Sequence, residues 1–148
     1  RASHCVGESN VHLGLTPKYR KAIFADDRTR MLTRDYILET SRRHGFVVAA
    51  IGFDMDHCHV FVTHWKNFAI AKLANIIKGF SSYMMRKYHW ELFKKDLYGD
   101  SFWSDGYFYR TVGAVNAETV KKYVSESQEY GYEGKELQQR KLIEFYPN

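Results

Sequence analysis

The pattern of hydrophobic and polar positions predicts a strand and then a helix in the first third of the chain. Residues 9–16 alternate as a half-buried strand does, and Pro17 ends the alternation. Residues 27–44 then place apolar side chains at helical spacing, at Met31, Leu32, Tyr36, Ile37 and Leu38. An aspartate at position 26 or 27 can cap this helix, and Gly45 stands where it ends.

The middle of the chain predicts two strands and a long helix. The apolar runs 46–53 and 60–64 have strand length, and residues 54–56 between them are short enough for a tight connection, so we expect neighbouring antiparallel strands. A second helix is expected from Asn67 to about Tyr88. Its apolar stripe consists of Ile70, Leu73, Ile76, Ile77, Phe80 and Met84.

The last third predicts a loop over 100–106, a strand over 107–112 and a helix that Asn116 caps. The order β-α-β-β-α-β-α predicts an α+β, ferredoxin-like (RRM-like) fold. We expect an antiparallel sheet with two helices on one face, followed by a C-terminal helix that bears Tyr123. The second face of such a sheet is open and suits nucleic acid.

The composition indicates that the chain is a single domain and that it is basic. The chain contains two prolines, no repeat and no low-complexity linker, so we expect a single domain over 1–148 with a peripheral tail from about 132. Aromatic residues make up 16%, and the net charge of +5 suits a polyanionic partner. Cys5 and Cys58 suggest no disulfide framework, and no segment is long and apolar enough for a membrane span. We therefore expect a cytoplasmic protein.

The most informative motif is His57-Cys58-His59, which precedes an apolar strand. Side chains alternate along a strand, so both imidazoles lie on one face, where they can bind one metal ion. Cys58 then packs in the core on the other face. By itself a pair of histidines is a weak signal, because two half-exposed histidines at a strand start would have the same spacing.

The neighbouring polar residues leave alternatives open. Asp54 and Asp56 can be hydrogen-bond acceptors that orient the imidazoles, or ordinary turn residues. His64 lies an odd number of residues from His59, on the other face, and is not expected to bind the metal. The remaining histidines have no companion pattern; they are His4, His12, His44 and His89.

Four stretches of the chain, spread from about Ser9 to Gln128, resemble the HUH tyrosine transposases of the insertion-sequence-200/605 family. The stretches are residues 11–21, a strand leading into a Pro-Lys-Tyr-Arg turn; residues 56–62, with Asp-His-Cys-His before Val-Phe-Val; residues 78–82, Lys-Gly-Phe-Ser-Ser; and finally Phe102-Trp103-Ser104, Thr111-Val112-Gly113 and Val120-Lys121-Lys122-Tyr123-Val124. Each is weak alone, but the four occur in the family's order and spacing.

The resemblance implies a transposase that cuts and rejoins single-stranded DNA through a 5′-phosphotyrosine. It implies Tyr123 as the nucleophile, and His57 and His59 as ligands of a divalent ion, Mg²⁺ or Mn²⁺. It also implies recognition of DNA hairpins, and a homodimer whose active sites are completed across the subunits. Without the resemblance, Tyr123 is one tyrosine among eleven.

The third metal ligand departs from the family's pattern. The family places a glutamine four residues after the tyrosine, where this chain has Ser127. Gln128 has a suitable amide oxygen but needs a π-type turn to face the tyrosine's side of the helix. Glu126 is a third candidate, because a carboxylate suits a hard cation. We favour Gln128.

Basic residues in two regions are candidates for DNA contacts, and each can also be a solvated surface charge. They are Lys18, Arg20, Lys21, Lys72, Lys78 and Arg86. Ser81 and Ser82 can bond phosphates or simply lie on the helix, and Trp103 and Tyr107 can stack on a base or belong to the core.

The leading hypothesis is thus an active single-strand transposase. A domesticated relative, such as a REP-associated transposase or a replication-initiator-like nickase, is an alternative within the enzymes. Two further alternatives are not enzymes. One is a catalytically silent DNA-binding module, and the simplest is a ferredoxin-like domain without a nucleic-acid role.

Overall fold

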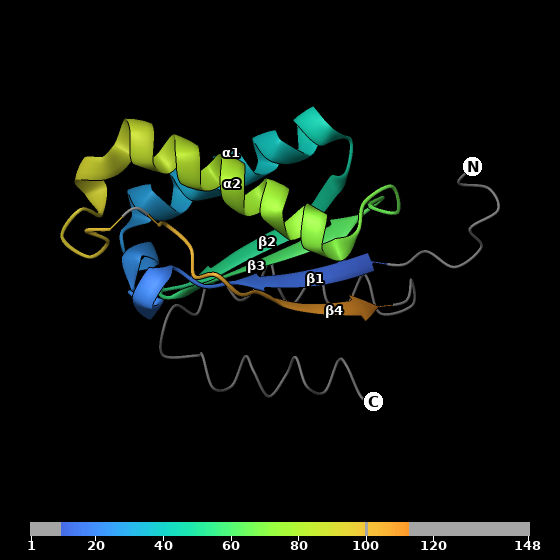
Figure 1. The fold of residues 1–148 in the computed structure, drawn as a ribbon, viewed down its shortest axis with the longest axis horizontal. Helices are drawn as coiled ribbons and strands as arrows, with labels where there is room; N and C mark the ends of the chain where they lie inside the picture. The colour runs from blue at the N-terminus through green and yellow to red at the C-terminus, as the bar shows by residue number, and fades with distance from the viewer. Residues whose placement is uncertain (1–9, 100, 113–148) are drawn as a thin grey trace.

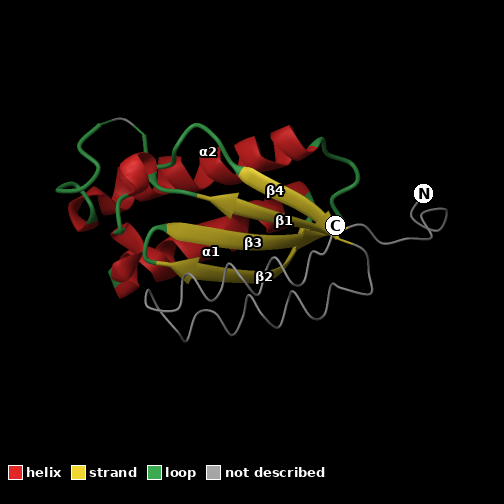
Figure 2. Ribbon diagram, turned by 90° about the horizontal axis from the view of Figure 1, so that it is seen from below, coloured by secondary structure: helices red, strands yellow, loops and turns green. Residues whose placement is uncertain are grey.

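Four antiparallel strands form one sheet in the order β2-β3-β1-β4. The computed structural model describes residues 10–99 and 101–112. The strands are β1 (Asn10–Leu15), β2 (Val47–Asp54), β3 (His57–Thr63) and β4 (Phe108–Val112). Figure 2 shows this order from below, with β1 and β3 in the centre of the sheet.

Two helices, α1 (Asp27–His44) and α2 (Ile70–His89), pack side by side on the same face of the sheet (Figure 1). Short 3-10 helices lie in the connections: η2 (Lys18–Arg20), η3 (Ile23–Ala25) and η4 (Trp90–Leu92). The predicted ferredoxin-like arrangement is therefore confirmed. The expected C-terminal helix lies outside the described residues.

The core lies between the sheet and the helices, because every second residue of the central strands points toward them. Val11, Leu13 and Leu15 of β1 are fully buried there, as are Cys58, Val60 and Val62 of β3. Burying an aliphatic side chain of this size contributes about 1.5–3 kcal/mol. The residues between them, including both histidines of the motif, point to the opposite face.

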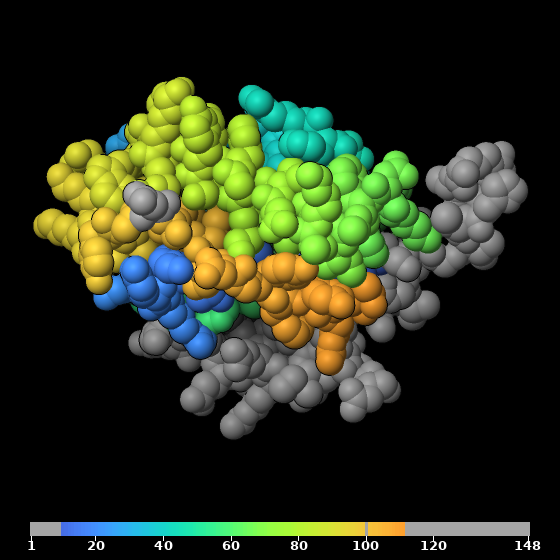
Figure 3. Space-filling view, in the orientation of Figure 1, coloured from blue at the N-terminus to red at the C-terminus, as the bar shows by residue number. Residues whose placement is uncertain are grey.

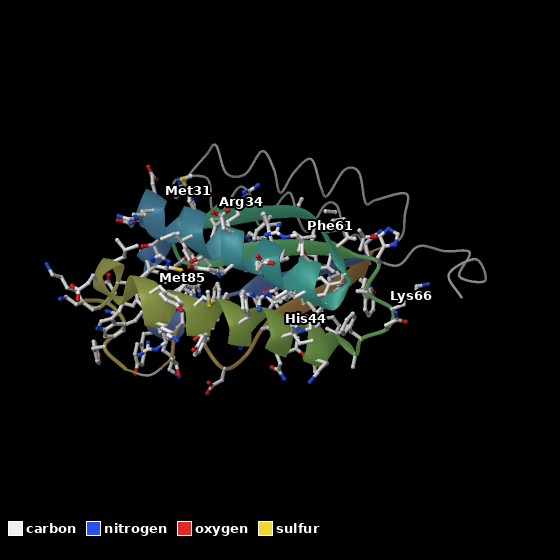
Figure 4. The ribbon with its side chains drawn as sticks, turned by 90° about the horizontal axis from the view of Figure 1, so that it is seen from above. Met31, Arg34, His44, Phe61, Lys66 and Met85 are labelled. Atoms are coloured by element: carbon white, nitrogen blue, oxygen red, sulfur yellow. The ribbon has the colours of Figure 1, made fainter. Side chains whose placement is uncertain are left out.

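Helix α1 begins and ends as predicted, and Ile37 of the expected stripe is fully buried, but the buried face is more polar than expected. Asp26 caps it by accepting a hydrogen bond from the Thr29 backbone N–H, and Gly45 ends it in the left-handed conformation with φ of 83°. Met31, expected in the apolar stripe, is exposed on the side of α1 away from α2 (Figure 4). Thr33 and Thr40 are buried instead, since each hydroxyl donates to the carbonyl four residues earlier.

Helix α2 starts three residues later than predicted, at Ile70 rather than Asn67. A turn precedes it, in which the Phe68 N–H bonds the Trp65 carbonyl. Met85, not Met84, completes the fully buried stripe with Leu73 and Ile77. None of the helices within the described part of the chain is long and apolar enough to cross a membrane.

The hairpin between β2 and β3 is tighter than the apolar runs indicated. Asp54 is the last residue of β2 and pairs with His57, the first residue of β3, so Met55 and Asp56 alone form the turn. The expected connection at 54–56 was thus one residue too long, and the expected position of His57 and His59 within the strand is confirmed. Strand pairing, which a hydrophobicity pattern does not register, extends β3 through the polar His57 and His59.

The segment before β4 is tied to the end of β1. Lys18 donates its backbone N–H to the Phe102 carbonyl, and Ser104 donates its own to the Thr16 carbonyl, at 2.9 and 2.8 Å. Figure 3 shows this orange segment lying against the blue residues that follow β1. Residues 101–106 of the predicted loop therefore hold the Pro-Lys-Tyr-Arg turn in place.

Candidate functional site

His57 and His59 lie on the same face of β3, as their spacing predicted. Their rings are nearly parallel, at 7°, with centroids 6.2 Å apart. Cys58 between them is fully buried in the core on the opposite face, and burial raises its thiol pKa well above the usual range. The thiol is therefore a packing group and not a metal ligand.

His59 stands between two glycines in the sheet. Gly14 of β1 and Gly52 of β2 are its direct cross-strand partners, so neither neighbouring strand has a side chain at the position directly opposite His59. His12, two residues before Gly14 on the same face, places its Nε2 3.1 Å from Nδ1 of His59. Burial, with smaller contributions from His59 and Arg110, lowers the pKa of His12 to about 3, so its ring is neutral at ordinary pH.

His57 is oriented by a carboxylate from the turn. Nδ1 of His57 lies 2.8 Å from Oδ1 of Asp56, and Nε of Arg20 donates to Oδ2 of the same carboxylate at 3.2 Å. A protonated Nδ1 leaves the His57 Nε2 lone pair for a ligand, as in carboxylate–histidine pairs at metal centres. Asp56 is buried and contacts the imidazole. Of the two roles considered for it, an orienting acceptor and an ordinary turn residue, the first describes these contacts.

The other aspartate, Asp54, is buried beside His59. Its Oδ2 lies 3.5 Å from Nε2 of His59, while Oδ1 has no hydrogen-bonding partner within the described residues. A buried carboxylate oxygen without a donor is costly unless a cation or proton compensates it. The Nδ1 atom of His57 therefore contacts Asp56 and that of His59 contacts His12, while Nε2 of His59 faces the Asp54 carboxylate.

This donor set suits a divalent cation, because imidazole and carboxylate both bind Mg²⁺-like and Mn²⁺-like ions in proteins. It is a partial set: across residues 10–99 and 101–112, no three His, Cys, Asp or Glu side chains form a complete metal site. The predicted nucleophile Tyr123 and the candidate third ligands Glu126, Ser127 and Gln128 lie outside the described residues.

The basic candidates divide into two groups. Arg20 reaches the histidine motif, where its Nη2 lies 3.5 Å from Nε2 of His57, and the nearby Lys21 is exposed. Lys18 lies 3.8 Å from the Asp105 carboxylate. The positive segment after β1 therefore lies next to the histidine pair.

The helix candidates have mostly internal contacts. Lys78 donates to the backbone carbonyls of Asp105 and Gly106, and burial lowers its pKa. Arg86 donates to the Gly99 carbonyl and stacks on Trp90. Lys72 is exposed.

Two residues considered for DNA contacts belong to the core instead. Trp103 is buried, and its Nε1–H donates to Oγ of Ser81 at 2.9 Å, so the indole is not a base-stacking surface. Ser81 is also fully buried and has no route to a phosphate. Tyr107 is half-buried against the core.

Sequence reasoning missed His12, whose contact to His59 joins positions 47 residues apart. A signal was present, because His12 and Gly14 alternate on one face of a strand predicted to lie in the same sheet. The pairing of β1 with β3, which decides the contact, was not available from the pattern of one strand alone.

Comparison with known proteins gives the same fold and a family. The family described as Transposase IS200 like matches residues 5–127. Sequence comparison with curated proteins finds no match. Among solved structures, a Deinococcus radiodurans R1 protein assigned as a transposase is similar with a TM-score of 0.63 and 20% identity, over 81% of this chain and 91% of that one.

A REP-associated tyrosine transposase bound to a REP hairpin is similar with a TM-score of 0.53 and 12% identity, over 80% of this chain and 66% of that one. At these identities the two structures support the fold. The family match, which spans most of the chain and includes the histidine motif, decides the assignment: the chain belongs to the IS200-like transposase family.

Proposed function

We propose that this transposase cleaves and rejoins single-stranded DNA at element ends through a 5′-phosphotyrosine on Tyr123. The observation that carries the proposal is the arrangement of His57 and His59 on one face of β3, with Asp56 orienting one ring and Arg20 beside it. This arrangement is consistent with the HUH type of active site that the motif resembles.

His57 and His59 would hold a divalent ion, Mg²⁺ or Mn²⁺, with Gln128 as the proposed third ligand and Glu126 or Ser127 as its alternatives. When bound, such an ion polarises the scissile phosphate and makes phosphorus more electrophilic. Asp56 favours a protonated Nδ1 on His57, which leaves the Nε2 lone pair as the metal-binding atom. Arg20 supplies a positive charge where an anionic phosphate would approach.

The covalent step exchanges one phosphoester bond for another. The Tyr123 hydroxyl loses its proton as its oxygen attacks phosphorus, and the bond from phosphorus to the 3′ oxygen breaks. The departing 3′ oxygen takes up a proton and leaves as a free 3′-hydroxyl. Because the phosphotyrosine keeps the energy of the cut phosphodiester, a second 3′-hydroxyl can displace the tyrosine and join the strands without ATP.

Single-stranded DNA with hairpins is the proposed partner. The similar REP-associated transposase is bound to a REP hairpin, and the net charge of +5 here suits a polyanion. Phosphate contacts are proposed for Lys18, Arg20, Lys21, Lys72, Lys78 and Arg86. We further propose a homodimer in which each subunit's tyrosine completes a site with the histidine pair of its partner.

The test is a protein–DNA adduct that survives denaturation. The full chain is incubated with single-stranded element ends and Mn²⁺, and adduct is scored by electrophoresis. Tyr123→Phe should abolish the adduct, EDTA should abolish it in the wild type, and His57→Ala should reduce it at least 100-fold, roughly the loss expected for a catalytic group.

Tyr88→Phe is the matched control, because Tyr88 is an exposed tyrosine on α2 remote from the motif in sequence. An undiminished adduct in Tyr123→Phe would overturn the assignment of the nucleophile. Hairpin binding with no adduct in any wild-type preparation would favour a catalytically silent DNA-binding module.

A further inference from the structure

Two exposed tyrosines from distant parts of the chain stack on each other. The rings of Tyr19 and Tyr98 have centroids 5.9 Å apart and planes 20° apart. Tyr19 is 56% and Tyr98 is 73% exposed. Most aromatic rings of the described chain pack in the core, so a stacked pair left in water is a feature that core packing does not account for.

The backbone holds Tyr19 in an unusual conformation. Tyr19 and Arg20 both have positive φ, at 59° and 55°, in the left-handed region that bulky residues rarely adopt. Hydrogen bonds on either side fix the turn: Lys18 N–H to the Phe102 carbonyl and Arg20 N–H to the Pro17 carbonyl, both at 2.9 Å. The fold therefore maintains a strained segment that keeps an aromatic ring exposed.

The segment under Tyr98 is also fixed. The hydroxyl of Tyr19 comes within 3.9 Å of the position a Cβ would take at Gly99, so the two segments are in close contact. Arg86 donates to the Gly99 carbonyl and stacks on Trp90, which anchors this loop to the end of α2. The tyrosine pair is thus a preformed surface and not a chance approach of two free side chains.

Positive charge surrounds the pair. Nζ of Lys18 lies 5.7 Å from the centre of the Tyr19 ring, and Lys21 is exposed nearby in sequence. Arg20, the residue after Tyr19, reaches the Asp56 carboxylate and the His57 ring. The pair therefore adjoins the basic segment 18–21, whose Arg20 contacts the histidine motif.

We propose that Tyr19 and Tyr98 form a stacking platform for an unpaired base of the DNA strand close to the phosphate that is cut. Aromatic faces stack on any base, while adjacent lysine and arginine side chains bind the backbone phosphates. The proposal rests on the proposed function for the identity of the strand. It requires neither Tyr123 nor a metal ion, so binding tests it separately.

The experiment measures binding of the full chain to a single-stranded oligothymidine with one 2-aminopurine, by fluorescence and at several salt concentrations. Tyr19→Ala and Tyr98→Ala should each weaken binding by about 10-fold at fixed salt, the loss expected for one stacked base. The quenching of 2-aminopurine on binding should also diminish. Tyr98→Phe should restore both, because the ring and not the hydroxyl makes the contact.

Salt dependence distinguishes stacking from charge. Loss of a tyrosine should leave the slope of log affinity against log salt unchanged, whereas Lys18→Ala should reduce that slope by about 0.7, the value for one phosphate contact on a single strand. Tyr83→Ala and Tyr88→Ala, at two other exposed tyrosines on α2, are matched controls that should bind like the wild type.

Wild-type affinity in Tyr19→Ala and Tyr98→Ala would overturn the platform, as would equal losses in the Tyr83 and Tyr88 controls. A change of oligomeric state in sedimentation without a change in DNA affinity would also overturn it, and would assign the pair to a protein interface. If the wild type forms no adduct while Tyr19→Ala and Tyr98→Ala still weaken DNA binding, only the proposed catalysis is overturned.

Discussion

Ser81 and Trp103 form a buried polar contact between α2 and the segment that leads into β4. The indole Nε1–H donates to Oγ of Ser81 at 2.9 Å, and the same hydroxyl donates to the Ile77 carbonyl at 2.7 Å. Both side chains are buried. The serine hydroxyl thus satisfies an indole that water does not reach, and it does so from a position where the family motif has a serine.

Ser81→Ala should lower the free energy of unfolding by about 1–3 kcal/mol, because the buried indole N–H would lose its acceptor. Urea unfolding of the two proteins measures the difference. Ser82→Ala, at the adjacent half-buried serine, is the control and should stay within about 0.5 kcal/mol of the wild type. Equal effects at both positions would contradict the role of the hydroxyl.

At the scale of single residues, alternation was enough to predict the faces of His57, Cys58 and His59. It could not predict that the hydroxyl of Ser81 and the indole of Trp103 meet, since 22 residues separate them. It also left the role of Asp56 open, because a turn aspartate and an orienting carboxylate have the same sequence pattern. Three-dimensional pairing of elements supplies this information.

Between the two helices, the hydroxyl of Tyr36 on α1 lies 2.7 Å from Nε2 of His89 at the end of α2. Burial, followed by the charges of Tyr88 and Asp35, raises the pKa of Tyr36. Burial, followed by the charge of Arg28, lowers the pKa of His89. At neutral pH the neutral imidazole therefore accepts the hydrogen bond that the tyrosine donates.

This contact predicts an acid-sensitive step in stability. A histidine with a lowered pKa in the folded state binds fewer protons than in the unfolded state, so stability falls as pH drops below about 6.5 toward the folded-state pKa. His89→Gln should show a smaller loss of Tm between pH 8 and pH 5 than the wild type. An identical pH profile in both proteins would show that His89 contributes nothing to it.

At the scale of elements, the types and order of the described helices and strands were predictable, and several boundaries were not. The predicted start of α2 at Asn67 failed because a turn at 65–68 precedes the first helical residue. The predicted connection at 54–56 was one residue too long because strand pairing includes the polar Asp54. In both cases backbone hydrogen bonds decide the boundary, and side-chain polarity does not.

For the whole molecule, the proposed dimer predicts complementation between inactive variants. Neither His59→Ala nor Tyr123→Phe should form adduct alone. Mixed, they should recover roughly a quarter of the wild-type adduct, because about half of randomly paired dimers are mixed and each has one intact composite site. A mixture of His57→Ala with His59→Ala is the control, since both changes affect the same half of the site. No recovery in the first mixture would place the tyrosine at its own chain's histidines.

The fold and the family could be predicted from the sequence, because the motifs occur in order along nearly the whole chain. The Tyr19–Tyr98 platform was not, because it joins the end of β1 to a loop after α2 through left-handed backbone at two non-glycine residues. No periodicity encodes such a contact.

The two-residue turn at Met55–Asp56 has a consequence for how the site assembles during folding. Asp54, His57 and His59 belong to one hairpin, which can close within about 1–10 μs without any long-range pairing. His12 arrives only when β1 docks across a separation of 47 residues, a slower closure. From these loop lengths we expect the carboxylate and the two imidazoles to come together before His12, the partner that holds His59 in place, joins them.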